Sequence, residues 1–211
     1  MAPRAYNNET RQQQQEALKQ RVAEVAARLH AERGVLATSY AEIAQAAGIS
    51  LPTMYKHFPD LGQLVRACSG HVAGKAPPFP ADDILAAPDL PAAARLLVDA
   101  MDRRHAHFEP WMTWREANRI PVIAEAAAAR RRDTVQLCEA LLNRHRGAAV
   151  YHRELAVLWE SLLDFELWHR LVYAHQLPRE RVRAHLHSLL LAVTGPQPAL
   201  SSPRPKRRSS P

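Results

Sequence analysis

The sequence predicts an all-α protein in which an N-terminal three-helix unit, containing a helix-turn-helix, is followed by a larger helical domain. Apolar residues recur at helical spacing along most of the chain, and no run of alternating apolar and polar residues is typical of a strand. Only seven glycines interrupt this pattern. With 211 residues, 47% of them hydrophobic, the chain is long enough to bury a packed core.

The first domain is expected to comprise residues 1–73. Its first helix is predicted over Arg11–Glu32, with Gly34 ending it, and its fourth over Leu61–Val72, with two short helices between them. The core-facing stripe of the first helix consists of Leu18, Val22, Val25, Ala26 and Leu29. The fourth helix joins this domain to the next, so we expect it to be the mechanical link between them.

The second domain is expected over residues 74–195, because five prolines between Gly74 and Pro91 mark the clearest break in the chain. Its helices are predicted over residues 91–108, 111–118, 121–145, 150–175 and 178–194. The last segment, residues 196–211, is rich in Pro, Ser and Arg and is expected to be a disordered basic tail.

The predicted helix over residues 150–175 is apolar almost all round. One face carries Tyr151, Leu155, Leu158, Leu162, Phe165 and Val172, and another carries Trp159, Leu163, Leu167 and Leu171. Such a helix needs neighbours on both sides, from its own chain or from a second subunit.

The net charge of +7 is unevenly distributed. Residues 1–75 carry nine basic and six acidic side chains, residues 76–200 carry fifteen of each, and the tail carries four basic ones. This distribution suits a polyanionic partner for the N-terminal domain.

No apolar run approaches the roughly 20 residues of a membrane span and no signal pattern begins the chain, so we expect a cytoplasmic protein without a membrane partner. Cys68 and Cys138 lie on apolar stripes and are expected to be buried, reduced thiols.

The segment from residue 34 to residue 64 is the most informative. Thr38 or Ser39 can cap a helix, Gly48 supplies the left-handed backbone of a tight turn, and Ser50 caps the next helix. The small core between the two helices would consist of Ile43, Ala44, Ala47, Ile49 and Met54. This pattern indicates a helix-turn-helix whose recognition helix presents Ser50, Leu51, Thr53, Tyr55, Lys56 and His57. An ordinary helical hairpin is the structural alternative.

These residues resemble a known family. The run from Gly34 to Ala44, followed by Ala47 to Phe58 with its ending Thr53-Met54-Tyr55-x-His57-Phe58, is similar to the DNA-binding signature of the tetracycline-repressor (TetR) family. The resemblance implies a bacterial homodimeric repressor that a small apolar or aromatic effector releases from palindromic double-stranded DNA. It also implies that helices 150–175 and 178–194 of both subunits form a four-helix dimer interface.

The same resemblance implies roles for single residues. Thr38 would cap the second helix and contact a phosphate, Tyr55 would lie against the sugar-phosphate backbone, and Phe58 would belong to the core. The complete expected DNA-binding set is Thr38, Ser39, Ser50, Leu51, Thr53, Tyr55, Lys56 and His57. This chain departs from the family pattern after Pro59, where Leu61 and Gly62 stand in place of a phosphate-binding lysine. Arg4 and Arg11 in the N-terminal arm are candidates to compensate.

A second group of residues suits a ligand site in the larger domain. Aromatic side chains with polar tips commonly line small-molecule pockets, although ordinary core packing is the alternative. The expected ligand-binding residues are Met101, His105, Phe108, Trp111, Trp114, Trp159 and Leu163.

Enzymatic and metal-binding functions have no support in the sequence. It contains no HExxH, no CxxC, no glycine-rich phosphate loop and no nucleophile elbow, so we expect neither an enzyme nor a bound metal or cofactor. The pair His105 and His107 is two residues apart and points to opposite helix faces. Arg130–Arg132 is expected to form a solvated surface. The functional alternative to a regulator is an all-helical small-molecule binding protein that does not bind DNA.

Overall fold

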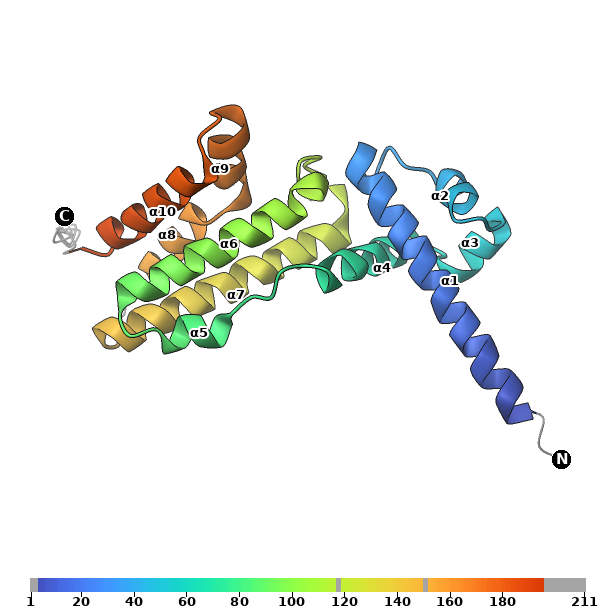
Figure 1. Cartoon of the computed structure of the whole chain (residues 1–211), viewed down its shortest axis with the longest axis horizontal. Coiled ribbons are helices and arrows are strands. Elements are labelled where there is room, and N and C mark those ends of the chain that lie inside the picture. Colours follow the sequence, from blue (N-terminus) through green and yellow to red (C-terminus); the bar gives the residue numbers. More distant parts are fainter. Residues whose placement is uncertain (1–3, 117–118, 150–151, 196–211) are drawn as a thin grey trace, which may run out of the picture.

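The all-α fold class is confirmed by the computed structural model, which describes residues 4–116, 119–149 and 152–195 (Figure 1). Within these ranges the chain forms helices and connecting loops and no strand. The predicted basic tail, residues 196–211, lies outside the described residues.

Four helices form the N-terminal unit: α1 (Arg4–Arg33), α2 (Tyr40–Ala46), α3 (Leu51–His57) and α4 (Leu61–Gly74). Helix α1 begins at Arg4 rather than at the expected Arg11, and its first half extends away from the rest of the unit (Figure 1). Residues 9–17 are all exposed, so this arm is helical without a core to cover. Glutamine, glutamate and alanine are good helix formers, which explains why the helix continues there.

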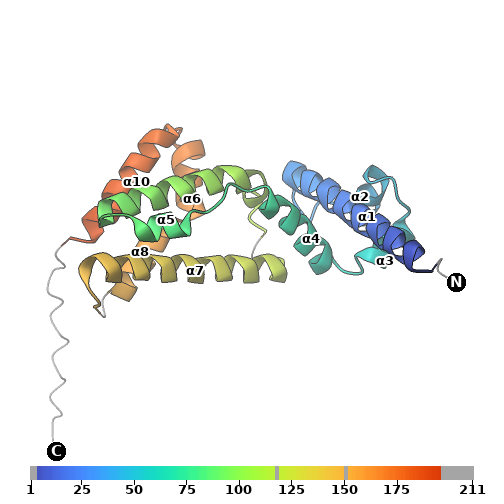
Figure 2. The ribbon, with the colours of Figure 1, turned by 60° about the horizontal axis from the view of Figure 1, so that its bottom comes forward.

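The larger unit contains α5 (Ala81–Ala86), α6 (Leu90–Met112), α7 (Pro121–Arg146), α8 (His152–Leu162), α9 (Phe165–His169), the π-helical turn η2 (Arg170–Ala174) and α10 (Arg179–Val193). Helix α10 packs on α6, and α8 packs on α7. Figures 1 and 2 show α8 and α10 at the end of the molecule that lies away from α1–α4. Each unit has its own apolar core, and the change from one to the other falls between Val72 and Ile84.

Three expectations for the middle of the chain are wrong. Helix α5 forms within the proline-rich segment, where no helix was expected. Helix α6 does not end at Phe108 but continues through Pro110 to Met112, and no separate helix is formed over the described residues 113–116. Pro110 removes only one backbone hydrogen bond from the last turn, and the bond from Thr113 N to the carbonyl of Glu109 (3.2 Å) still closes that turn.

The single helix expected over residues 150–175 is also wrong. The chain breaks after Leu162, and Asp164 adopts an extended conformation (φ −66°, ψ 146°). Its carboxylate caps α9 by accepting a hydrogen bond from Glu166 N at 2.8 Å. The break turns Phe165 into the core of its own chain, where it is 4% exposed.

A buried carboxylate holds α6 against the C-terminal helices. Asp102 is 2% exposed and accepts hydrogen bonds from Trp168 Nε1 (2.8 Å) and Arg179 Nη2 (2.7 Å). Burial opposes ionisation, but the hydrogen bonds from Arg179 and Trp168 outweigh it and lower the pKa of Asp102. Helix α6 is therefore anchored at its middle.

Other expectations concern the thiols, metals and membranes. Cys68 and Cys138 are both free and buried, as expected. In the described part of the chain no group of three metal-ligating side chains is gathered. None of the described helices is both long enough and apolar enough to cross a membrane.

Candidate DNA-binding and ligand-binding sites

Helix α2 is capped by Ser39, which settles the choice between Thr38 and Ser39. The Ser39 hydroxyl accepts from Glu42 N at 3.2 Å, and Ser39 N donates to the Glu42 carboxylate at 2.8 Å, so the two residues form a capping box. Thr38 is only 8% exposed and its hydroxyl donates to the carbonyl of Gly34 at 2.7 Å. The capping role implied for Thr38 is therefore wrong, and of the expected DNA-binding residues it is the one that is buried.

The turn between α2 and α3 has the predicted construction. Gly48 has a φ of +67°, which only glycine adopts without strain, and Ile49 N donates to the carbonyl of Ala44 at 3.0 Å. Ile43 and Met54 are completely buried between the helices. This turn fixes the angle at which α3 leaves α2, so the position of α3 on the surface follows from local sequence.

Helix α3 presents one exposed face. Ser50 caps the helix by accepting from Thr53 N at 3.3 Å, and Thr53 and His57 are half-buried. Leu51 and Lys56 are exposed. This face has the size and the mixture of hydrogen-bonding, apolar and cationic groups that a major-groove helix requires.

Tyr55 completes that face and is 51% exposed. Its ring lies 5.0 Å from the ring of Tyr40, which supports it from α2. Burial, with smaller contributions from Asp60 and Tyr55, raises the pKa of Tyr40 to about 12, so its hydroxyl remains a proton donor at neutral pH.

The start of α4 carries a capping carboxylate and no lysine. Asp60 caps α4 by accepting from Gln63 N at 2.8 Å, and its pKa is lowered chiefly by that bond. The Asp60 carboxylate therefore occupies this helix end. Neither Leu61 nor Gly62 offers a cationic side chain to a phosphate.

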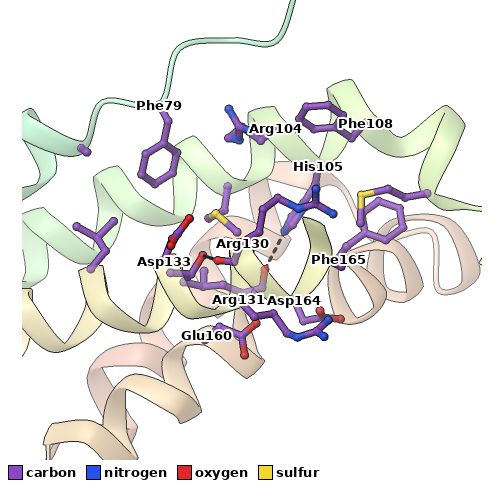
Figure 3. Close-up of a pocket in the computed structure, with 17 residues that line it drawn as sticks. Phe79, Arg104, His105, Phe108, Arg130, Arg131, Asp133, Glu160, Asp164 and Phe165 are labelled. Atoms are coloured by element: carbon purple, nitrogen blue, oxygen red, sulfur yellow. Dashed lines mark hydrogen bonds between the residues drawn. The ribbon is translucent and has the colours of Figure 1, made fainter. Parts of the chain in front are cut away.

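A pocket of about 440 Å³ opens between α6, α7 and the α8–α9 break (Figure 3). Its apolar lining consists of Phe79, Met101, Phe108, Met112, Leu137, Leu163 and Phe165, and its charged lining of Arg104, Arg130, Arg131, Asp133, Glu160 and Asp164. His105 lies on its wall, where Nε2 donates to the carbonyl of Leu163 at 2.8 Å, and burial lowers the pKa of His105. The pocket falls within the 300–1,000 Å³ typical of small-molecule sites.

Four of the seven expected ligand-binding residues line this pocket, namely Met101, His105, Phe108 and Leu163. The structure places the three expected tryptophans elsewhere. Trp159 is completely buried and donates to Thr194 Oγ1 at 3.0 Å, while Trp111 and Trp114 contact the N-terminal unit. Arg130, Arg131 and Arg132 are all exposed, as expected, and Arg130 and Arg131 also border the pocket.

The end of α6 and the loop after it hold the N-terminal unit. Trp111 Nε1 donates to the carbonyl of Ala27 at 2.7 Å, and Trp114 Nε1 donates to the carbonyl of Ala31 at 3.1 Å. On the opposite face from His105, His107 Nε2 donates to the carbonyl of Val72 in α4 at 3.0 Å. These bonds tie both α1 and α4 to the larger unit.

Glu116 makes the strongest of these connections. Its carboxylate accepts hydrogen bonds from Val35 N (2.7 Å) and Leu36 N (2.9 Å), which lie just beyond the end of α1. Gly34 has a φ of +85°, and a Cβ there would lie 2.9 Å from Glu116 Oε1, so this close approach requires glycine. We call Trp111, Trp114 and Glu116, with the backbone groups that they bind, the junction.

Sequence reasoning missed Glu116 and the pocket arginines. The available signal was the glycine at residue 34, which was assigned only to ending the first helix. Nothing in the sequence shows that a carboxylate 81 residues later approaches Val35.

Comparison with known proteins agrees with this geometry. Residues 22–68 match the sequence profile described as "Bacterial regulatory proteins, tetR family". No curated protein sequence matches the chain.

Several solved structures share the fold over most of its length. A tetR-family transcriptional regulator from Streptomyces coelicolor is 22% identical and aligns over 85% of this chain and 82% of its own, with a TM-score of 0.60. NalD, the secondary repressor of the MexAB-OprM multidrug efflux pump in Pseudomonas aeruginosa, is 19% identical over 84% of this chain and 96% of its own (TM-score 0.59). The SmeT–triclosan complex is 18% identical over 84% and 91% (TM-score 0.61).

Proposed function

We propose that this chain, whose residues 22–68 match the profile of the tetR family of bacterial regulatory proteins, is a DNA-binding transcriptional repressor, which a small apolar or aromatic ligand releases from a palindromic operator. The observation that carries this proposal is the exposed face of α3, held by the Gly48 turn at the end of the molecule away from the pocket (Figure 1). Two of the structures that share the fold support it, since NalD is a repressor and SmeT is in complex with triclosan.

The proposed dimer would form through α8 and α10. Val157 and Leu158 on α8 are 45% and 48% exposed, and Leu189 on α10 is 45% exposed. Helices α8 and α10 contact each other, so all three exposed apolar side chains lie on one helix pair. Covering these side chains with the same helix pair of a second copy gives a twofold dimer, in which two α3 helices can reach successive major grooves about 34–36 Å apart.

Ligand release would run through α6. Met101, His105 and Phe108 face the pocket from this helix, while Trp111 at its end binds α1. A ligand that prefers one position of α6 therefore also prefers one position of the N-terminal unit, which is the requirement for coupling. Helix α4 remains the covalent link, and the junction supplies a second connection.

Operator binding tests the proposal directly. The purified protein is used to select duplexes from random DNA, and affinity for the selected palindrome is measured by fluorescence anisotropy. Replacing Leu51 by alanine should weaken binding by about 5–150-fold, because it is exposed on α3 and a base contact contributes about 1–3 kcal/mol. Leu96→Ala, at a comparably exposed leucine on α6, should leave the affinity unchanged.

Selection that enriches no duplex would contradict DNA binding. The all-helical small-molecule binding protein would then be the better description of this chain.

The junction gives a separate prediction. Glu116→Gln removes the charge that holds Val35 N and Leu36 N, so both amides should exchange hydrogen faster, as measured by mass spectrometry. We expect operator affinity to fall, because the N-terminal unit is no longer held in one orientation. The free energy of the lost charge-assisted bonds, about 1.5–3 kcal/mol each, limits the size of that fall. Glu125→Gln on the exposed surface of α7 is the control. Faster exchange with unchanged operator affinity would show that the junction has no part in DNA binding.

A further inference from the structure

Three arginines line the pocket without forming an ion pair. Arg104, Arg130 and Arg131 make no ion pair in the described part of the chain. Other arginines of the larger unit do form ion pairs, since Arg179 binds Asp102 at 2.7 Å and Arg153 binds Glu139 at 3.1 Å. The cationic groups at the pocket are therefore available to a ligand.

Arg104 and Arg130 form the more positive side of the pocket. The guanidinium of Arg104 lies over the ring of Phe108, 5.3 Å from its centroid, and 5.9 Å from that of Phe79. Burial lowers the pKa of Arg104, while partial desolvation at the pocket and the charges of Arg104 and Arg131 lower the pKa of Arg130. Guanidinium groups stay protonated under these conditions, so like charges are held together at this place.

None of the pocket carboxylates, Asp133 included, forms an ion pair with either of these two arginines in the described part of the chain. Burial and the charge of Asp164 raise the pKa of Glu160, and Arg131 is the arginine whose charge opposes that rise. The carboxylate of Glu160 therefore interacts with Arg131 rather than with Arg104 or Arg130. In Figure 3, Glu160 and Asp164 lie beside Arg131, while Arg104 lies between Phe79 and Phe108.

We propose that the ligand of this pocket is an organic anion, whose carboxylate or sulfonate binds Arg104 and Arg130 and whose apolar or aromatic body packs on Phe108, Leu137 and Phe165. The inference rests on the proposed ligand-binding function of the pocket and names the chemical class of its ligand. Arginine suits this role because its planar donors bind a carboxylate or sulfonate in two places at once. The cavity of about 440 Å³ limits the ligand to a small molecule.

Two fluorescent probes with the same ring system test the inference. 1-Anilinonaphthalene-8-sulfonate carries a sulfonate, and N-phenyl-1-naphthylamine is the same body without it. The sulfonate probe should bind the wild-type protein more tightly than the neutral one. Arg130→Met should weaken the sulfonate probe by at least about tenfold, because it removes charge-assisted hydrogen bonds, and should change the neutral probe less than about twofold.

Arg132→Met is the matched control, since Arg132 carries the same charge two residues further along α7 but does not line the pocket. It should leave both probes unchanged. Arg104→Met is the second test variant and should repeat the effect of Arg130→Met; circular dichroism confirms that each variant is folded.

Each contrary outcome points to a different failure. If the neutral probe binds wild type as tightly as the sulfonate probe and lowers operator affinity, the pocket regulates DNA binding but is not selective for anions. If Arg130→Met and Arg132→Met weaken the sulfonate probe equally, net charge rather than the pocket attracts it, and the inference is overturned. If neither probe binds, both the anion proposal and the assignment of this cavity as the ligand site are wrong, while DNA binding by α3 is unaffected.

Discussion

Operator affinity is expected to fall by a factor of about 10³–10⁵ when the salt concentration rises from about 50 to 200 mM. The expected dimer would place two copies of Tyr55 and Lys56, with the backbone near them, against DNA phosphates. We expect about 6–10 phosphate contacts per dimer, and binding at each releases condensed counterions. Fluorescence anisotropy titrations at four or five salt concentrations give the slope of log affinity against log salt.

Lys56→Ala refines this prediction. The loss of one cation per protomer should reduce the slope by about two per dimer and weaken binding to all duplexes alike. Arg144→Ala is the control, because Arg144 is exposed in the last turn of α7, at the end of the molecule away from α3 (Figure 1). A slope near zero for the wild-type protein would contradict binding to the DNA backbone.

The helix-turn-helix could be predicted from sequence because its determinants are local. Gly48 is needed for the turn and Ser50 for the cap of α3, and both act within a few residues of their own position. The buried side chains Ile43 and Met54 follow from helical spacing. Even the error at Thr38 was a choice between adjacent hydroxyls, which the capping box of Ser39 with Glu42 decides.

The errors have two origins, a local cap that the apolar pattern conceals and contacts between distant segments. Asp164 breaks the expected helix 150–175 because its carboxylate caps α9, whereas the apolar pattern on both sides of it continues without interruption. Trp111 and Trp114 were expected in a pocket because they are aromatic with a polar tip. Their indole N–H groups instead find carbonyls of α1, more than 80 residues earlier in the chain.

The pocket arginines also show what helical spacing leaves undetermined. Arg130 and Arg131 were interpreted as solvated because a run of three arginines circles a helix and cannot all face inward. The structure brings α6 and the α8–α9 break against one part of α7, so two of the three border a cavity while Arg132 does not. Which side of a helix becomes a site depends on its neighbours, and helical spacing does not identify those neighbours.

Charges introduced on α8 and α10 are expected to separate the proposed dimer and remove specific DNA binding. Leu158→Arg with Leu189→Arg places two cations where each leucine is nearly half exposed in the single chain, so the subunit itself should stay folded. A second copy could not cover that surface without burying unpaired charge. Sedimentation velocity at micromolar concentration should show a monomer, and operator affinity should fall by roughly 10²–10⁴-fold, the usual gain from linking two binding modules.

The choice of leucines decides whether this experiment tests assembly or folding. Phe165 belongs to the expected apolar face of helix 150–175, but after the break at Asp164 it is 4% exposed and lies against the rings of His105 (5.6 Å) and Trp168 (5.9 Å). An arginine at residue 165 would unfold the larger unit, whereas an arginine at residue 158 meets solvent.

Leu96→Arg, at an exposed leucine outside α8 and α10, should leave the dimer intact. If the double variant sediments as a dimer with wild-type operator affinity, the subunits associate through another surface. If wild type itself is a stable monomer that binds the palindrome, two α3 helices are not needed for recognition and the proposed mode of DNA binding is wrong.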